Sequence, residues 1–114
     1  MKKVLWFSRH IMSKEQKEAL GECEIEQVDR SINSAFDLQE EIDRNDIIAI
    51  VAPINLQAQF LKAANGKPVI MAVNNRVVVP SDDGGESKVE FHFVKWEQLD
   101  KIEVVKHDFN PEEC

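Results

Sequence analysis

One unbroken apolar run near the middle of the chain most constrains the fold. Residues 47–52 read Ile-Ile-Ala-Ile-Val-Ala, with Asp46 before the run and Pro53 after it. The run has no alternating polar face, which is the pattern of a parallel strand buried on both sides by helices. We therefore predict the central strand of an open α/β sheet, followed by a turn at 53–55. In such sheets a ligand usually binds beyond the carboxyl ends of the strands, so this turn is the first place to look for function.

Strands and helices alternate along the rest of the chain. Ser13 with Gln16, and Ser34 with Asp37, have the spacing of helix capping boxes. Asn55 is the expected cap of a third helix. Gly21 and Gly66 suit the residues just past the ends of two helices. The predicted strands before the last third of the chain are 4–7, 23–28, 47–52 and 69–73, and the helices between them start near 14, 35 and 56.

The last third of the chain reads as antiparallel structure. The stretch Pro80–Ser87, PSDDGGES, has loop composition, and Gly84-Gly85 within it predicts a hairpin turn. The strand at 88–96 that follows places Val89, Phe91 and Phe93 on one side, and 77–79 extend the strand before the loop. A last short strand is expected at 102–105. The sequence thus predicts an α/β fold over residues 1–114, one domain with a three-layer, Rossmann-like, mostly parallel sheet and a C-terminal antiparallel β-hairpin.

Composition excludes several classes of partner. The formal net charge of −7 argues against binding duplex nucleic acid or an anionic membrane surface, because such binding needs a basic field. No run of about 18 apolar residues and no basic leader with an apolar core is present, so we expect no membrane span and a cytoplasmic location. Cys23 and Cys114 match no metal-ligand or redox spacing, and the simplest interpretation is a half-buried Cys23 and a terminal Cys114.

Charge is unevenly placed along the chain. Residues 1–14 and 47–79 carry Lys or Arg but no Asp or Glu. Both segments contain predicted central strands and the loops that leave them. The acidic chain is therefore expected to present a neutral or positive crevice there, although buried strands lack acids for structural reasons too.

Familiar motifs for cofactors and hydrolysis are missing from the sequence. There is no GxGxxG, GxxxxGK[ST], GxSxG or HExxH, so we expect no dinucleotide cofactor and no metal.

Polar residues follow three of the predicted strands, and the carboxyl ends of parallel strands open on one edge of a sheet. Arginine offers a planar fork of donors for phosphate, serine and asparagine offer neutral hydrogen bonds, and a helix amino end offers free amides. Together they suit a phosphodiester. The alternative is that the arginines are surface or salt-bridged residues and that the histidine only bonds a neighbouring carbonyl. The candidate binding residues are Ser8, Arg9, His10, Pro53, Asn55, Asn74, Asn75 and Arg76.

Two further side chains receive structural interpretations. His92 is expected to be simply exposed, on the outer face of its strand. Trp96 is interpreted mainly as a packing residue, with a contact at a dimer interface as the alternative.

The start LWFSRHIMSKEQKEAL, the turn IVAPIN, the strand PVIMAVNNRVVV and the later FHFVKW resemble the small single-domain members of the CRISPR-associated Rossmann-fold (CARF) family. Those proteins include stand-alone ring nucleases and sponges that act on cyclic oligoadenylates in type III CRISPR antiviral defence. Their apolar first strand runs into a Ser/His turn and a "TPEQ"-like helix start, matched here by residues 7–10 and 13–16. Their late strand ending in small polar residues and Arg is matched by 74–76.

The resemblance implies a homodimer with a cyclic oligoadenylate across its two-fold axis, either cleaved without metal or sequestered. Arg9 and Arg76 would then hold phosphate, and Ser8 and Asn75 would position ribose or phosphate. His10, aided by Arg9, would carry the catalysis as acid or base. The alternative is a non-enzymatic protein-interaction module of a defence system or mobile element, which would use the hairpin and Trp96 as its contact surface.

Overall fold

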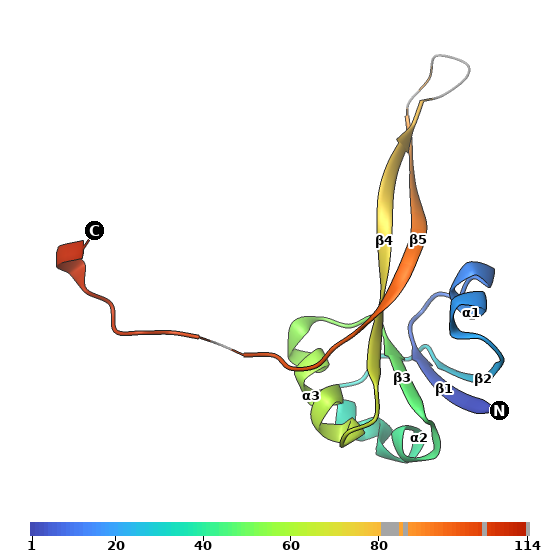
Figure 1. Ribbon diagram of the computed structural model, residues 1–114, viewed down its shortest axis with the longest axis horizontal. Coiled ribbons are helices and arrows are strands. Elements are labelled where there is room, and N and C mark those ends of the chain that lie inside the picture. Colours follow the sequence, from blue (N-terminus) through green and yellow to red (C-terminus); the bar gives the residue numbers. More distant parts are fainter. Residues whose placement is uncertain (81–84, 86, 104, 114) are drawn as a thin grey trace.

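The computed structural model describes residues 1–80, 85, 87–103 and 105–113. Within them, strands and helices alternate through the first two thirds of the chain and a long hairpin follows (Figure 1). The elements in chain order are β1 (Lys2–Phe7), α1 (Lys14–Leu20), β2 (Cys23–Val28), the 3₁₀ helix η1 (Ala35–Leu38), α2 (Gln39–Arg44), β3 (Ile47–Ile50), α3 (Ile54–Ala64), β4 (Val69–Val79), β5 (Lys88–Gln98) and the 3₁₀ helix η2 (Pro111–Glu113).

The five strands form one mixed sheet in the order β2-β1-β3-β4-β5. The pairs β1–β2, β1–β3 and β3–β4 are parallel, and only β4–β5 is antiparallel. The predicted α/β class, with a mostly parallel sheet and a C-terminal antiparallel hairpin, is confirmed. From β1 the chain first moves outward to β2 and then returns to β3 on the other side, so the strand order reverses between β1 and β3. The connections that leave β1 and β3 run to opposite sides at this point, and a crevice is expected there.

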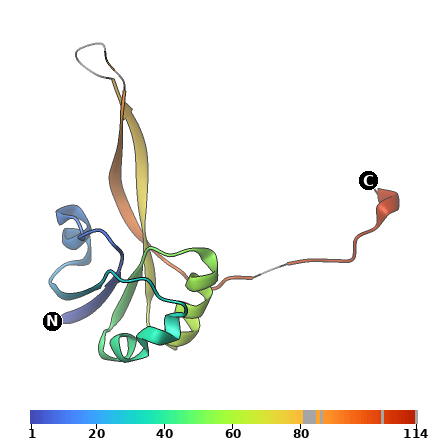
Figure 2. The same cartoon turned by 180° about the vertical axis from the view of Figure 1, so that it is seen from behind.

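Apolar residues pack on both faces of the parallel strands. Leu5 and Ile48 belong to a cluster with α2, η1 and α3, whereas Val4 and Ala49 face a second cluster that includes Met12 and Trp96. Neighbouring residues in a strand point to opposite faces, so this split places α2 and α3 on one side and α1 on the other (Figures 1 and 2). Residues 48–50 are fully buried, which explains the centre of the apolar run. The prediction of a strand through residue 52 was wrong at its end, because β3 stops at Ile50 and Val51 is 54% exposed.

The helix starts follow the expected capping residues in two cases out of three. Ser13 accepts a hydrogen bond from the Gln16 amide at 3.2 Å and starts α1. Ser34 forms its capping box with Asp37, but the element it starts is η1, which continues into α2. The prediction for Asn55 was wrong, because α3 begins at Ile54 with Pro53 as its N-cap. Pro53 offers no side-chain cap, and the helix starts from its carbonyl, which accepts from the Gln57 amide at 3.0 Å.

Residues with positive φ follow the ends of α1 and α3. Gly21 follows α1 with φ 78°, as expected. At the end of α3, Asn65 takes the left-handed conformation with φ 49°, and Gly66 follows with φ 96°. The reversal after α3 therefore needs both residues rather than the glycine alone.

The hairpin extends far beyond the rest of the sheet. β3 pairs with β4 only at Val69 and Ile70, so the remainder of β4 pairs with β5 alone and rises from the body as a two-stranded ribbon (Figure 1). The prediction that 77–79 extend the strand is confirmed, because β4 runs to Val79. The expectation that residues 74–76 stand at the end of a strand was therefore wrong. The Gly84-Gly85 turn falls partly outside the described residues.

A β-bulge sets the faces of the ribbon. Val73 pairs with Lys95 and Asn74 pairs with Phe93, which leaves Val94 as the extra residue. The bulge puts Trp96 on the same face as Phe93, and their ring centroids lie 5.6 Å apart. Trp96 also meets Trp6 edge to face at 5.8 Å and donates from Nε1 to the Gln16 carbonyl at 3.1 Å. The interpretation of Trp96 as a packing residue is confirmed.

After β5 the chain leaves the body as an extended tail (Figures 1 and 2). The strand predicted at 102–105 is not formed at residues 102, 103 and 105, and Val104 lies outside the described residues. Cys23 is half-buried and free, as expected, whereas Cys114 is not among the described residues. In the described part of the chain, no helix has the length and apolar character needed to cross a membrane.

Candidate functional site

A tightly held turn connects β1 to α1 at the carboxyl edge of the sheet. Its first residue, Ser8, is buried and donates its amide to the Val28 carbonyl at the end of β2. The Gln27 side-chain amide donates to the carbonyls of both Ser8 and His10 at 3.0 Å, and Trp6 Nε1 donates to the His10 carbonyl at 2.8 Å. The backbone of this turn is therefore fixed by side chains from two strands.

The imidazole of His10 is left unbonded by this arrangement. Its backbone amide donates to Ser8 Oγ at 3.1 Å, which fixes the position of its Cα. Among the described residues, the ring itself makes no hydrogen bond, and His10 is exposed. A histidine on a rigid backbone with a free ring is suited to contact a ligand.

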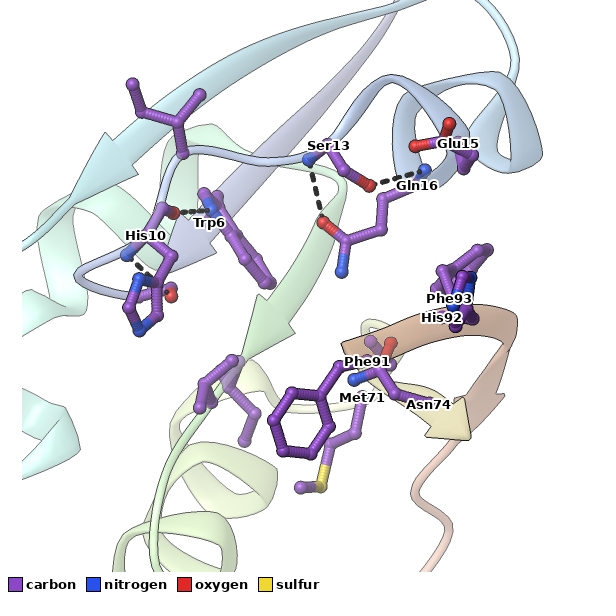
Figure 3. A pocket seen from close by; sticks show the side chains of 15 residues that line it. Trp6, His10, Ser13, Glu15, Gln16, Met71, Asn74, Phe91, His92 and Phe93 are labelled. Carbon is purple, nitrogen blue, oxygen red and sulfur yellow. Dashed lines mark hydrogen bonds between the residues drawn. The ribbon is translucent and has the colours of Figure 1, made fainter. Parts of the chain in front are cut away.

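A large cleft, which we call the hairpin cleft, opens beside this turn, with a volume of about 630 Å³. Figure 3 shows Trp6, His10 and Gln16 on one side of it and Met71, Phe91 and Asn74 on the other. One wall therefore comes from β1 and the region that leads into α1, and the other from the base of the projecting hairpin. Its lining mixes aromatic rings with hydroxyl, amide and imidazole groups, as small-molecule sites do.

A second and smaller cavity, the loop cavity, lies on the opposite side of the same turn, with a volume of about 310 Å³. Its walls come from the ends of β1 and β2, the loop 29–32 and the start of α3. Ser8, His10 and Val51 line both spaces, so the turn separates one cavity from the other.

Arginine side chains mark the loop cavity as an anion site. Arg9 Nη2 donates to Ser31 Oγ at 2.6 Å, which ties the turn after β1 to the loop after β2. Arg30 lines the same cavity and lies 4.0 Å from Glu41, and Asp29 supplies one carboxylate. Because Arg30 is paired with Glu41, Arg9 is the guanidinium left to meet an anionic group at this rim, beside the Asp29 carboxylate.

The amino end of α3 reaches the same place. Pro53 caps the helix without a side-chain hydrogen bond, and both Pro53 and Leu56 line the loop cavity. Gln57 Nε2 instead donates to the Ala52 carbonyl at 2.8 Å and steadies the approach to the helix. The backbone amides in the first turn of α3 have no side-chain cap, so the positive end of the helix dipole faces the loop cavity.

The structure brings together some of the residues predicted from sequence and separates others. Ser8, Arg9, His10 and Pro53 lie around the loop cavity, and Asn74 joins Ser8 and His10 around the hairpin cleft. The remaining three line neither space. Asn55 lies in the first turn of α3, and Asn75 and Arg76 lie farther out on the ribbon, opposite His92 and Phe91 of β5.

Several lining residues were missed or misjudged from sequence. His92 is exposed, as expected, with Nε2 3.0 Å from Glu90 Oε2, and its place at the edge of the hairpin cleft was missed. Asp29, Arg30 and Ser31 were not considered, although they follow a parallel strand and therefore belong at the same edge. Their place directly after a predicted strand was the signal that could have indicated them.

The expectation of a positive crevice holds only locally. Most of the cations in the acid-free segments lie elsewhere: Lys2 Nζ bonds the Leu20 carbonyl, and Lys67 Nζ bonds the carbonyls of Ile42 and Asp43. Lys2 is the first residue of β1 and Lys67 precedes β4, so both lie at the amino edge of the sheet. Arg9, from a segment without acids, and Arg30, from an acidic one, supply the positive charge at the carboxyl edge.

An ion pair with two hydrogen bonds lies outside the site. Arg44 binds Glu26 with Nε and Nη2, and Asn45 donates to the same carboxylate. The hydrogen bond from Arg44 lowers the pKa of Glu26 below its ordinary value of 4.5, against a smaller opposing effect of burial. This pair joins β2 to the end of α2 and has a structural role.

Among the described residues, no group of three or more His, Cys, Asp or Glu side chains is placed to hold a metal ion. Comparisons of the chain with models of protein families, with curated proteins and with solved structures gave no significant match.

Proposed function

We propose that this chain is a three-layer, Rossmann-like domain that binds a cyclic oligoadenylate at the carboxyl edge of its sheet and cleaves the ring without a metal. The observation that carries the proposal is the Ser8–His10 turn, which is locked by Gln27 and Trp6 and presents a free imidazole between two cavities. Phosphate, sugar and base would each find a partner of suitable chemistry within this region.

The chemistry requires little beyond positioning and charge. The 2′-oxygen of a ribose attacks the adjacent phosphorus, the bond from phosphorus to the 5′-oxygen breaks, and the products carry a 2′,3′-cyclic phosphate and a free 5′-hydroxyl. His10 takes the proton from the 2′-hydroxyl, and water returns a proton to the leaving 5′-oxygen. Arg9 and the amino end of α3 stabilise the charge on the phosphate oxygens. Asn74, rather than Asn75 or Arg76, contacts the ligand from the hairpin side.

A homodimer is part of the proposal, and the hairpin is the surface proposed for it. One face of the ribbon carries Val78, Val89 and Phe91, which are 60%, 43% and 72% exposed. Exposed apolar side chains gathered in this way mark interaction surfaces, and a two-stranded ribbon gains stability from a third layer. Because Phe91 also lines the hairpin cleft, a second copy packed on this face would close the cleft over its ligand.

The test of the catalytic role uses two histidine variants. His10→Ala is expected to bind cyclic tetra-adenylate within threefold of wild type and to lose cleavage by at least a hundredfold, since it removes the base and leaves both cavities. The matched control is His107→Ala, which removes an exposed histidine of the tail and should cleave like wild type. Cleavage by His10→Ala at the wild-type rate would refute the role of His10. Binding without products by the wild type would assign sequestration instead.

A second candidate function is a non-enzymatic interaction module, and the exposed face of the hairpin is the observation that favours it. Trp96 is not available for such a surface, because it packs against Trp6 and Phe93. Light scattering of wild type and of the double variant Val78→Ser, Phe91→Ser separates the proposals. A wild-type dimer that becomes monomeric in the variant supports the two-fold ligand site, whereas a strictly monomeric wild type favours the interaction module.

A further inference from the structure

The sheet has an open edge where β5 runs into the tail. β5 is the last strand of the sheet, so within the described residues no strand lies along its outer side. Leu99, directly after β5, still donates its amide inward to the Val69 carbonyl at 2.8 Å. Successive residues of a strand turn their backbone groups to alternate sides, so those of Gln98 point outward. Residues 95–103, which we call the Leu99 edge, therefore offer backbone groups to a further strand.

The charges of the Leu99 edge are complementary to a second copy of themselves. The stretch reads KWEQLDKIE, with Leu99 at its centre. When two copies run antiparallel about this residue, Lys95 lies opposite Glu103 of the second copy. Glu97 lies opposite Lys101 in the same way. Opposite charges directly across an antiparallel pair stabilise it, and the two-fold symmetry repeats each of these contacts.

The structure presents these charges ready for such a pairing. Lys95 Nζ lies 3.6 Å from Glu97 Oε1, and Lys101 Nζ lies 3.1 Å from Glu103 Oε1. Ion pairs between residues two apart are typical of an extended chain, in which alternate side chains share a face. All four side chains are more than half exposed. They can therefore exchange partners with a second copy without first leaving a buried site.

Apolar side chains alternate with these charges and also match across the pair. In the same register Trp96 lies opposite Ile102. The indole is already packed on Trp6 and bonded to the Gln16 carbonyl, so it forms a fixed wall, and part of it remains exposed. Ile102 is also partly exposed. Placing the Ile102 side chain of the second copy beside this wall removes apolar surface of both residues from water.

The tail does not make this pairing with its own β5. The same register within one chain would leave only residues 98–100 for the turn, and these include no Gly or Asn for a left-handed position. The tail instead leaves past α3 and runs away from β5 (Figures 1 and 2). The radius of gyration is accordingly 18.2 Å, against about 13 Å for a compact domain of this length. The complement of the Leu99 edge is therefore a second chain.

We propose that the Leu99 edge is a self-association surface, at which residues 95–103 of two copies pair as antiparallel strands about a two-fold axis through Leu99. The pairing joins two five-stranded sheets into one. It goes beyond the proposed function, because it needs no nucleotide and none of its residues lines either cavity. The axis lies at the opposite end of β5 from the hairpin turn, so the ribbon face with Val78, Val89 and Phe91 stays free for the contact proposed above.

The experiment reverses charges in the variant Val78→Ser, Phe91→Ser, which lacks the ribbon contact and is called the ribbon variant here. Association is followed by sedimentation equilibrium up to millimolar protein, because a contact of this size is weak. Adding Lys95→Glu sets two glutamates opposite each other, and adding Glu103→Lys sets two lysines opposite each other. Each change acts twice in the symmetric pair, so each chain alone should associate at least tenfold more weakly than the ribbon variant.

An equimolar mixture of the two charge variants is the decisive sample. The introduced Glu of one chain then meets the introduced Lys of the other, so the mixture should associate within threefold of the ribbon variant. Lys106→Glu is the matched control, because it reverses a charge of the exposed tail outside the Leu99 edge and should leave association unchanged. Circular dichroism and thermal unfolding verify that every variant keeps the fold.

Three results would overturn the Leu99 edge as a self-association surface. They are charge variants that associate like the ribbon variant, a mixture that associates no better than either chain alone, and a ribbon variant that stays monomeric at every concentration. The proposed function is read separately, from binding and cleavage of cyclic tetra-adenylate. Intact rings would overturn that function and leave this contact standing.

Discussion

Replacing Trp96 by Ala should loosen the hairpin from the body of the protein. The indole packs edge to face on Trp6 at 5.8 Å, contacts Phe93 at 5.6 Å and donates to the Gln16 carbonyl at 3.1 Å. Loss of a fully buried Trp costs about 3–5 kcal/mol. Trp96 is only partly buried, so we expect the free energy of unfolding to fall by about 2–3 kcal/mol.

The assay is urea unfolding followed by far-UV circular dichroism, together with thermal unfolding. For a domain of this size, the expected loss corresponds to a fall in Tm of roughly 8–12 °C. Trp96→Phe is the control, because it keeps a ring against Trp6 and removes only the hydrogen bond, for a loss of about 1 kcal/mol. A loss below about 0.5 kcal/mol in Trp96→Ala, which is the size of an ordinary surface substitution, would refute the anchoring role of this residue.

Three further predictions concern the fold that supports the site. The hydrogen bond from Arg44 lowers the pKa of Glu26 in the folded protein, so the unfolded chain takes up a proton at this carboxylate more readily. The ion pair therefore stabilises the fold above about pH 4.5, and this contribution is lost as the pH falls through the lowered pKa. The urea midpoint of Glu26→Gln should therefore fall less than that of wild type between neutral and acidic pH. Equal falls in the two proteins would contradict the stabilising role of the Arg44–Glu26 pair. Phe60→Ala should lower the free energy of unfolding by about 3–5 kcal/mol, since Phe60 is fully buried against Phe7, and urea unfolding showing a loss under about 1 kcal/mol would count against that packing. Ser13→Ala should cost about 1 kcal/mol through the lost cap of α1, whereas Ser13→Asp, which can cap in the same way, should unfold at nearly the wild-type urea concentration.

The parallel part of the fold was predictable because burial on both faces leaves a direct mark on composition. Ile48, Ala49 and Ile50 are fully buried, and only apolar residues can occupy such positions. The cap at Ser13 was also readable, since its capping box depends on residues three apart. These signals are local in the sequence and need no knowledge of tertiary contacts.

The hairpin was only partly predictable, because its geometry depends on pairing between distant residues. A polar stretch such as 74–76 reads equally well as the end of a strand or as the start of an exposed ribbon, and only the short β3–β4 pairing distinguishes them. The bulge at Val94, which turns Trp96 inward, leaves no pattern in the sequence. His92 is exposed as predicted, but its place beside the hairpin cleft follows from the course of the ribbon and could not be predicted.

The site was predicted best where it depended on one strand end and worst where it depended on strand order. Ser8, Arg9 and His10 follow β1 directly and lie where expected. Arg30 and Ser31 follow β2, an edge strand whose alternating acids gave no sign of a site. The parallel pairing of β2 with β1 brings them beside Arg9. The cap of α3 was predicted two residues too late, at Asn55, because Pro53 takes that position.

The most direct test of the proposed function is to incubate the purified protein with cyclic tetra-adenylate and cyclic hexa-adenylate and to follow Tm and reaction products together. A ligand present at about 100 times its Kd stabilises the folded state by about 2.7 kcal/mol. For this chain we therefore expect a rise in Tm of roughly 10 °C with one of the rings, together with linear products that end in a 2′,3′-cyclic phosphate. An unchanged Tm and intact rings at millimolar ligand would contradict the proposal that this sheet edge binds a cyclic oligoadenylate.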